Sequence, residues 1–322
     1  MDKVLKAAFP EQLSVQPTAR ARLAVRNKAA CCGSSVCRIC PVDAKFTVLN
    51  GFPELYNDNR ITLWTECPAV RLETSGGRIT GVHCRRKNQD LLVRGDLVAL
   101  ATNAIFNAFL MSRSGMSHPW LGKGLNEQVS LSVRMDLHNL PNVGGSTVGS
   151  GTGYMFWDGA HRETRPACML LTGLPRGIRL ERGRWRDYTS FAFVFEDWPS
   201  QENFVRPSPE DPEKPETVYK GFSDYLEAGR RALPEMAETL AAKLPVERIY
   251  YPERWNETEA HILGTTRMGN DPATFVVDAN QVHHTYRNLI VLGSSVFPSC
   301  SPANPTLTLS ACSLRAADKL FG

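Results

Sequence analysis

Residues 288–308 read NLIVLGSSVFPSCSPANPTLT, and this stretch decides the fold. It opens with a short, mostly apolar run of the kind that forms a buried strand. The run ends in Gly293 and Ser294, which leave backbone N–H groups free at the carboxyl end of the strand. Ligands bind at such strand ends in open α/β sheets, so we expect a ligand-binding edge here.

A helix should follow this strand and run from about Thr306 to the end of the sequence. Asn304 is a good N-cap residue, and Pro305 suits the first turn of a helix. The N-terminus of a helix carries partial positive charge, which suits an electron-rich ring edge. The helix therefore adds to the expected binding edge.

Further elements lie upstream. Residues 96–101 (DLVALA) predict a second buried strand, and residues 103–111 predict a helix after it. A meander should precede them, with a hairpin turn at Gly76-Gly77 and strands at 61–66, 70–74, 79–85 and 91–93. The remaining segments are a loop at 139–153, a strand-rich region at 165–195 and an amphipathic helix at 218–244.

Composition excludes several classes of function. The 322 residues are 42% hydrophobic with a formal net charge of +4, which is ordinary for a soluble protein of one or two domains. There is no long Lys/Arg run, so we expect no nucleic acid partner. No transmembrane helix and no signal peptide are predicted. The expected location is cytoplasmic by default, with a periplasmic location through a secreted partner left open.

Several short motifs follow one another near the C-terminus. They are His261-Ile-Leu-Gly-Thr-Thr-Arg-Met-Gly269, Val276-Val-Asp278, the strand with Gly293-Ser-Ser295, Pro298, and Ala303-Asn-Pro-Thr-Leu-Thr308. This order resembles the C-terminal signature of the glucose–methanol–choline (GMC) oxidoreductase family. Residues 31–47 and 60–126 resemble the middle of that family, although Asn103 stands where a glycine is usual and Glu127-Gln128 stand where a histidine is usual.

The resemblance implies an FAD-dependent enzyme that oxidises a CH–OH group of an alcohol, sugar or polyol. His261 would take the hydroxyl proton while hydride passes to flavin N5, and Asn304 would hydrogen-bond the substrate oxygen. The implied cofactor-binding residues are Ala101, Thr102, Asn103, Asp278, Gly293, Ser294, Pro305 and Thr306. From the residues alone, His261 could be a structural histidine and Asn304 only a helix cap. The other histidines lack such a context, and the pair His283-His284 precedes a turn and is expected on the surface.

A flavoprotein of this family should also contain a strand, a Gly-x-Gly-x-x-Gly turn and a helix that bind the FAD pyrophosphate. No such unit precedes the cysteine-rich loop, and Gly149-Ser-Gly-Thr-Gly153 reads as a loop. Three explanations stay open: a partner chain carries that half in a hetero-oligomer, the chain is a truncated product, or it is a non-catalytic structural or interaction subunit. We expect the first, with the two buried strands in one sheet that the partner completes.

Four of the nine cysteines fall within ten residues, at Cys31, Cys32, Cys37 and Cys40. Such a cluster in a reducing compartment suggests a metal more than a disulfide framework. The loop resembles the cluster loop of the family's iron–sulfur branch, the membrane-linked sugar and polyol dehydrogenases, which implies a [3Fe–4S] cluster. A metal-free loop and a zinc site are the alternatives.

The predicted fold class is therefore α/β. Residues 1–128 and 256–322 are expected to form a partial FAD-binding domain that lacks its nucleotide-binding βαβ unit. Residues 129–255 are expected to form an α+β substrate domain with an antiparallel sheet.

Overall fold

The structure is a computed structural model, and it describes residues 1–14, 24, 28–32, 40–142, 151–173, 178–256 and 258–322. The chain divides into two compact units. Unit 1 comprises residues 1–63, 130–195 and 228–257, and unit 2 comprises residues 64–129, 196–227 and 258–322. Two segments group differently from the prediction: residues 1–63 share unit 1 with most of the predicted substrate domain, and residues 196–227 share unit 2 with most of the predicted FAD-binding domain. No change in composition marks where the chain passes from one unit to the other. The roles of the domains in FAD and substrate binding stay predictions.

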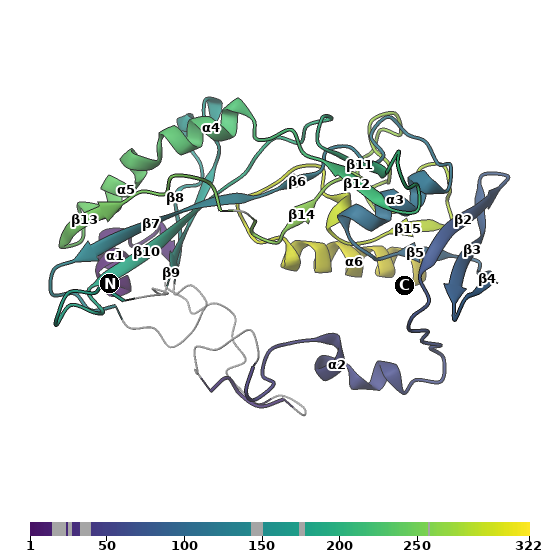
Figure 1. Cartoon of the computed structure of the whole chain (residues 1–322), viewed down its shortest axis with the longest axis horizontal. Helices are drawn as coiled ribbons and strands as arrows, with labels where there is room; N and C mark the ends of the chain where they lie inside the picture. Colours follow the sequence, from purple (N-terminus) through teal and green to yellow (C-terminus); the bar gives the residue numbers. More distant parts are fainter. Residues whose placement is uncertain (15–23, 25–27, 33–39, 143–150, 174–177, 257) are drawn as a thin grey trace. The chain divides into compact units, whose positions relative to one another are not determined.

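Unit 1 is built on a six-stranded sheet with the order β1-β8-β9-β10-β7-β13 (Figure 1). The pairs β1–β8, β8–β9, β9–β10 and β7–β13 are antiparallel, as expected for this half of the chain. The strands are β1 Leu13–Ser14, β7 Val129–Leu137, β8 Gly151–Phe156, β9 Cys168–Gly173, β10 Tyr188–Phe195 and β13 Val246–Tyr250. A loop was expected at 139–153, but its last three residues belong to β8, where Gly151 and Gly153 pair with β9. Residues 143–150 lie outside the described residues.

The core of unit 1 comes from strand residues at every second position. Alternate side chains of a strand share one face, so an apolar residue at each second position gives a continuous buried surface. Two such sets are fully buried: Leu131, Val133, Met135 and Leu137 on β7, and Phe191, Phe193 and Phe195 on β10.

Short helices complete unit 1: α1 Asp2–Ala8, α2 Val48–Gly51, the 3₁₀ turns Pro53–Tyr56 and Ala160–Glu163, and α5 Leu233–Ala241. The single helix expected at 218–244 is wrong, because α4 ends at Arg231 and α5 begins at Leu233. Pro234 stands in the first turn of α5 and has no N–H to continue the hydrogen bonds of α4. α4, Asp224–Arg231, starts in unit 2 and ends in unit 1.

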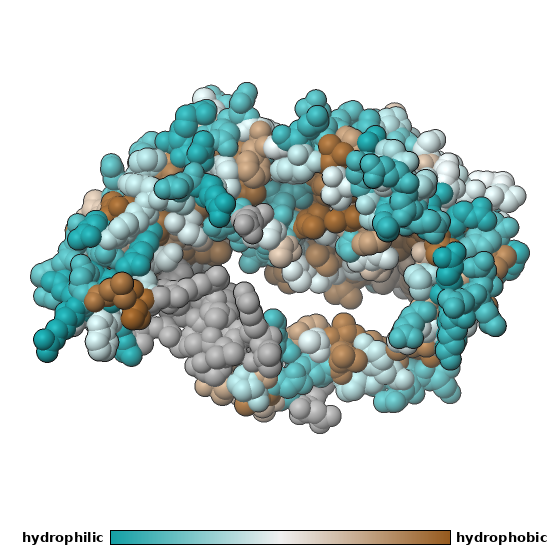
Figure 2. Space-filling view, viewed as in Figure 1, coloured by the Kyte–Doolittle hydropathy of each residue, from teal (hydrophilic) through white to brown (hydrophobic). Residues whose placement is uncertain are grey.

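The segment around α2 keeps its apolar side chains on the surface. Thr47 and Asn50 form a capping box that starts this one-turn helix. Figure 2 shows hydrophobic surface over this stretch. Six apolar residues there are at least 42% exposed: Phe46, Val48, Leu49, Phe52, Leu55 and Tyr56. The strand expected at 61–66 does not form, since these residues have no strand partner in the described part of the chain.

Unit 2 contains the expected meander, with the order β2-β3-β4. Its turn residues Gly76 and Gly77 have φ of +55° and +71°, which a tight hairpin of this type requires. The strands are β2 Ala69–Ser75, β3 Arg78–Arg86 and β4 Gln89–Val93. The hairpin prediction is confirmed.

The two buried strands of unit 2 pair with each other in parallel. β5, Val98–Leu100, aligns with β15, Leu289–Val291, so that Leu289 faces Val98. Asn288 joins this pair to the meander, because its side chain accepts from the N–H of Ile79 and donates to the carbonyl of the same residue, both at 2.9 Å. The prediction that both strands lie in one sheet is confirmed.

The remaining elements of unit 2 are α3 Ala104–Arg113, α6 Thr306–Phe321, the 3₁₀ turn Ser294–Val296, β6 Asn126–Glu127 with β14 Ile262–Leu263, and β11 Phe204–Pro207 with β12 Pro215–Val218. None of the helices in the described part of the chain has the length and apolar character needed to cross a membrane.

The expectation that His283 lies on the surface is wrong, since its side chain is only 5% exposed. Its Nδ1 accepts hydrogen bonds from the backbone N–H of Thr285 at 3.0 Å and of Tyr286 at 3.1 Å. Burial, followed by the nearby His118, His284 and Arg287, lowers the pKa of His283 to about 4. The pair His283-His284 looked like surface because both residues are polar, but the turn uses the first ring as an acceptor.

Unit 2 should therefore lose stability in mild acid. The pKa of His283 is lower in the folded chain than in the unfolded chain, so this stabilisation is complete above about pH 6.5 and is lost as the pH falls towards 4. The loss should reach up to about 3 kcal/mol. The replacement His283→Asn keeps an acceptor near the position of Nδ1 but does not titrate. Urea melts of both proteins at pH 7, 5.5 and 4.5 test this: equal losses on acidification would rule out His283 as the cause.

Candidate active site

The catalytic histidine predicted from the sequence lies beside the short ladder of β6 and β14. Glu127 pairs with Ile262 and Asn126 with Leu263, which places His261 next to the end of β6. Gly264 follows with φ of +79°, and a Cβ there would come within 2.1 Å of the carbonyl oxygen of Gly124. Only glycine permits this close approach, so the position of His261 is fixed by backbone contacts on both sides.

Glu127 holds the backbone that leads into His261. Its Oε1 accepts from the hydroxyl of Thr258 at 2.6 Å, from the N–H of Glu259 at 2.8 Å and from the N–H of His261 at 3.0 Å. A carboxylate that accepts several such bonds fixes a loop firmly, because bonds to a charged acceptor are stronger than neutral ones. Glu127 therefore acts on the main chain of His261, not on its ring.

Gln128 joins the two predicted catalytic residues. Its side chain is buried, with 1% exposed. Its amide nitrogen donates to the carbonyl oxygens of Ser301 at 3.1 Å and Ala303 at 3.0 Å, and its oxygen accepts from Nδ1 of His261 at 3.2 Å. The same end of the Gln128 amide lies 3.2 Å from Oδ1 of Asn304. The structure thus brings His261 and Asn304 to one amide, while the His261 ring is half-buried and Asn304 is exposed.

The predicted helix-cap role of Asn304 is wrong. α6 begins at Thr306, and its N-cap is Pro305, which makes no side-chain cap bond. Asn304 lies one residue too early, and its amide is turned to Gln128. In the part of the chain that the structure describes, no side chain caps the first N–H groups of α6.

Three of the predicted cofactor-binding residues follow β5. Ala101, Thr102 and Asn103 are all exposed, and Asn103 caps α3 by accepting from two backbone N–H groups at 2.9 Å. The fully buried Asn107 accepts from the N–H and hydroxyl of Thr102 and donates to the carbonyl of Leu292 at 3.0 Å. Asn107 therefore ties together the carboxyl ends of β5 and β15.

Gly293 and Ser294 lie at the corresponding end of β15. Gly293 has φ of +94°, and no atom lies within 4 Å of the place where a Cβ would stand. The hydroxyl of Ser294 donates to the carbonyl of Ile262 at 2.7 Å, which connects this strand end to the residue after His261. The open space at Gly293 gives a backbone edge that a flat ring could approach closely.

Asp278 does not present a free carboxylate. Its Oδ1 accepts from the N–H of Asn280 at 2.8 Å and of Val282 at 3.0 Å, and its Oδ2 pairs with Arg287 at 2.9 Å. These contacts close a turn. A role in cofactor binding stays a prediction for Asp278, and also for the other residues of the predicted set.

The cysteine cluster is only partly visible. Cys31 and Cys32 are exposed, and Cys40 is half-buried, whereas Cys37 lies outside the described residues. Hydrogen bonds from the backbone of Val42, then of Lys45, lower the pKa of the Cys40 thiol. Within the described ranges, no group of three or more His, Cys, Asp or Glu side chains is placed to hold a metal ion. The iron–sulfur cluster stays a prediction that no described contact supports.

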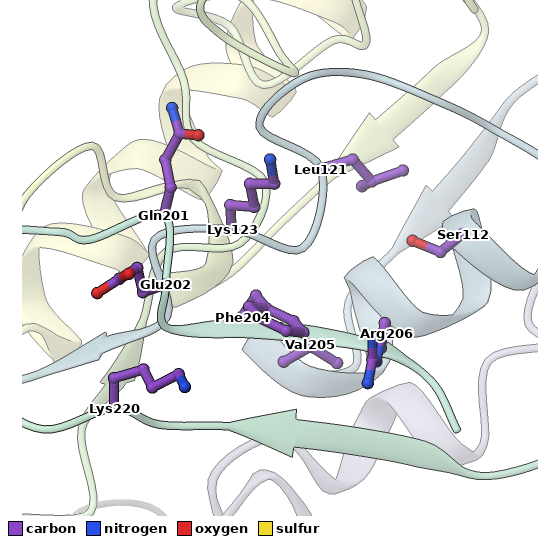
Figure 3. A pocket seen from close by; sticks show the side chains of 9 residues that line it. All are labelled: Ser112, Leu121, Lys123, Gln201, Glu202, Phe204, Val205, Arg206 and Lys220. Atoms are coloured by element: carbon purple, nitrogen blue, oxygen red, sulfur yellow. The ribbon is translucent and has the colours of Figure 1, made fainter. Parts of the chain in front are cut away.

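A separate hollow of about 530 Å³ lies in unit 2, between the end of α3 and the strands β11 and β12 (Figure 3). Its wall includes Lys123, Lys220 and Glu202 around the ring of Phe204. None of the predicted catalytic or cofactor-binding residues lines it. The hollow is therefore distinct from the site built around Gln128.

Family models match most of the chain. Two family models, both described as GMC oxidoreductase, match residues 5–130 and 199–313. The 6'''-hydroxyparomomycin C oxidase of Streptomyces lividus is 28% identical over 326 residues, covering 90% of this chain and 58% of that protein. The paromamine 6'-oxidase of Streptomyces fradiae is 32% identical over 133 residues, covering 40% of this chain and 25% of that protein.

Solved structures share the fold. The pyridoxine 4-oxidase of Mesorbium loti superposes with a TM-score of 0.62 at 19% identity, over 81% of this chain and 58% of that one. This degree of identity shows the fold and not the substrate. The chain spans little more than half the length of this structure and of the Streptomyces lividus oxidase.

Proposed function

This chain belongs to the glucose–methanol–choline (GMC) oxidoreductase family, and we propose that it carries the catalytic half of an FAD-dependent enzyme that oxidises a CH–OH group. The observation that carries the proposal is the shared Gln128 amide, which holds both His261 and Asn304. The two residues are far from Gln128 in sequence, and both remain accessible from outside. A structural histidine with a helix-capping asparagine would not explain this arrangement.

In the proposed reaction, His261 is the general base. Its Nδ1 is bonded to Gln128, so Nε2 is the atom available to take the hydroxyl proton of the substrate. Histidine suits this role because it titrates near neutral pH. The amide of Asn304 faces Gln128 with one end, and an N–H of the same amide would hold the substrate oxygen.

The residues at the strand ends fit FAD as the cofactor. The open edge at Gly293, the exposed residues Ala101 and Thr102, and the uncapped N-terminus of α6 at Pro305 and Thr306 supply backbone groups for a flat, electron-rich ring. When bound, FAD would supply the acceptor for the hydride that leaves the substrate carbon. The chain's own part is then to hold the alcohol and remove its proton.

We propose a hydroxyl-bearing, sugar-like molecule as substrate. The Streptomyces relatives are named as oxidases of paromamine and of 6'''-hydroxyparomomycin C, and this supports hydroxylated amino sugars as the first substrates to test.

We further propose that a partner chain supplies the site for the ADP half of FAD. Two observations on unit 2 support this. In the described part of the chain, the other edge of β15 bonds to residues 281–283, whereas β5 pairs with β15 alone. Parallel strands normally lie inside larger, covered sheets, so the outer edge of β5 is the place for a further strand. α6 also exposes three apolar residues at seven-residue spacing, Leu307 at 82%, Leu314 at 72% and Phe321 at 74%. A helix covers such a stripe by packing against another element.

Residues 1–322 alone should therefore bind FAD weakly or not at all. Titration with FAD, followed by flavin fluorescence, should show no saturable binding, and co-expression with a chain that carries a Gly-x-Gly-x-x-Gly unit should yield a yellow complex. Oxidation of 6'''-hydroxyparomomycin C by that complex, measured as the carbonyl product, tests the activity. Stoichiometric FAD in the isolated chain would contradict the partner, and a flavin-free, inactive complex would favour a non-catalytic subunit.

A further inference from the structure

We propose that Gln128 is a positioning residue that fixes the tautomer of His261, with the proton on Nδ1 and the lone pair on Nε2. The proposal rests on the proposed role of His261 as the base. It adds a residue that determines which ring nitrogen can accept the substrate proton.

The hydrogen-bond partners of Gln128 decide the orientation of its amide. An amide nitrogen has two protons to donate, and an amide oxygen has two lone pairs that accept. Two carbonyl oxygens, those of Ser301 and Ala303, lie 3.1 and 3.0 Å from one end of the amide. A carbonyl can only accept, so that end of the amide must be the nitrogen.

The other end of the amide is then the oxygen, which can only accept. It lies 3.2 Å from Nδ1 of His261, so Nδ1 must carry the proton. A neutral imidazole has only one N–H, and therefore Nε2 is unprotonated. The Oδ1 of Asn304 lies 3.2 Å from this oxygen, so the second lone pair is used only if the Asn304 amide also turns by 180° and presents its nitrogen. All four hydrogen-bonding positions of the buried amide are then used.

The neutral amide also suits the reaction. A carboxylate at this position would favour the positively charged imidazolium, which cannot take another proton. The carboxylate of Glu127 bonds to the backbone N–H of His261 through Oε1 and not to the ring. Gln128 therefore orients the ring without adding a charge next to it.

The tautomer can be read directly, without flavin or substrate. In the chain of residues 1–322 labelled with ¹⁵N-histidine, long-range ¹H–¹⁵N spectra distinguish a protonated from an unprotonated ring nitrogen, and the variant His261→Gln identifies the signal among the seven histidines. We expect a protonated Nδ1 and an unprotonated Nε2 at neutral pH. A protonated Nε2 would overturn the proposal.

Two variants test the functional consequence in the flavin-loaded complex. Gln128→Leu should slow flavin reduction by about 10–100-fold, because the ring is no longer held in the active tautomer, and should also raise the substrate KM, because Asn304 loses the same partner. Gln128→Glu should move the acid limb of the pH–rate profile to higher pH by about one unit or more, because a carboxylate stabilises the imidazolium. A parental rate in the first variant, or an unmoved profile in the second, would contradict the proposal.

Gln281→Glu is the matched control. Gln281 is also fully buried in unit 2, and its amide nitrogen donates to the carbonyl of Cys312 at 2.6 Å. This variant should lower the Tm but leave the pH–rate profile unmoved. If the NMR result holds while His261→Ala reduces flavin at the parental rate, the proposed function falls and the tautomer assignment stands.

Discussion

The variant His261→Ala should keep its flavin but lose about 10²–10⁴-fold in the rate of flavin reduction by the alcohol. The ring is the base in the proposed reaction, and its backbone position is fixed independently of the ring. Glu127 bonds to the main-chain N–H of His261, and β14 pairs with β6 directly afterwards. Removal of the ring should therefore leave the loop in place.

Stopped-flow absorbance of the flavin-loaded complex measures this rate. Asn304→Ala should also slow reduction and should raise the substrate KM, because Asn304 holds the substrate oxygen. The fraction of bound flavin, measured in the same samples, separates a lost base from a lost cofactor. Parental reduction rates in both variants would show that the chemistry lies elsewhere.

The second large effect concerns the stability of unit 1. Arg179→Met should lower the free energy of unfolding by about 2–4 kcal/mol, because the buried Asp136 carboxylate loses one of its cations and two backbone carbonyls lose their donor. Arg179 is only 4% exposed and pairs with Glu247 at 2.9 Å, with Asp136 at 3.8 Å and with Glu181. It also donates to the carbonyls of Leu137 and Asp187 at 3.0 and 3.1 Å.

Arg184→Met provides the control, since Arg184 bonds to the same carboxylate from a more exposed position. Hydrogen bonds from His138, Arg184 and Arg179 lower the pKa of Glu247 to about 2. Arg184→Met should therefore lower the free energy of unfolding by about 1 kcal/mol or less. Urea denaturation measures both values, and equal losses in the two variants would show that the burial of Arg179 does not matter.

Much of the fold could be predicted from the sequence, because strong local patterns determine those elements. The hairpin at Gly76-Gly77 needs two residues with positive φ, and the strand at 288–292 needs a short apolar run. Two predictions failed at local features that the pattern of apolar and polar residues does not show. Pro234 splits a helix that its apolar pattern would continue, and His283 is buried because the turn that follows it uses its ring as an acceptor.

The candidate site shows the same division. His261 and Asn304 could be found from the order of motifs, whereas Glu127 and Gln128 appeared only as a departure from the family's usual histidine. Their partners lie more than a hundred residues away in the sequence, so no local pattern reveals these contacts. Asn107 was missed for the same reason, because it bonds to Leu292.

The most direct test of the central claim is anaerobic mixing of the flavin-loaded complex with 6'''-hydroxyparomomycin C while flavin absorbance is followed. The account predicts that the flavin bleaches fully in the parent complex, with one carbonyl product formed per flavin, and that bleaching slows by about 10²–10⁴-fold in His261→Ala. Bleaching at the same rate in both proteins would contradict the assignment of His261 as the base that drives alcohol oxidation.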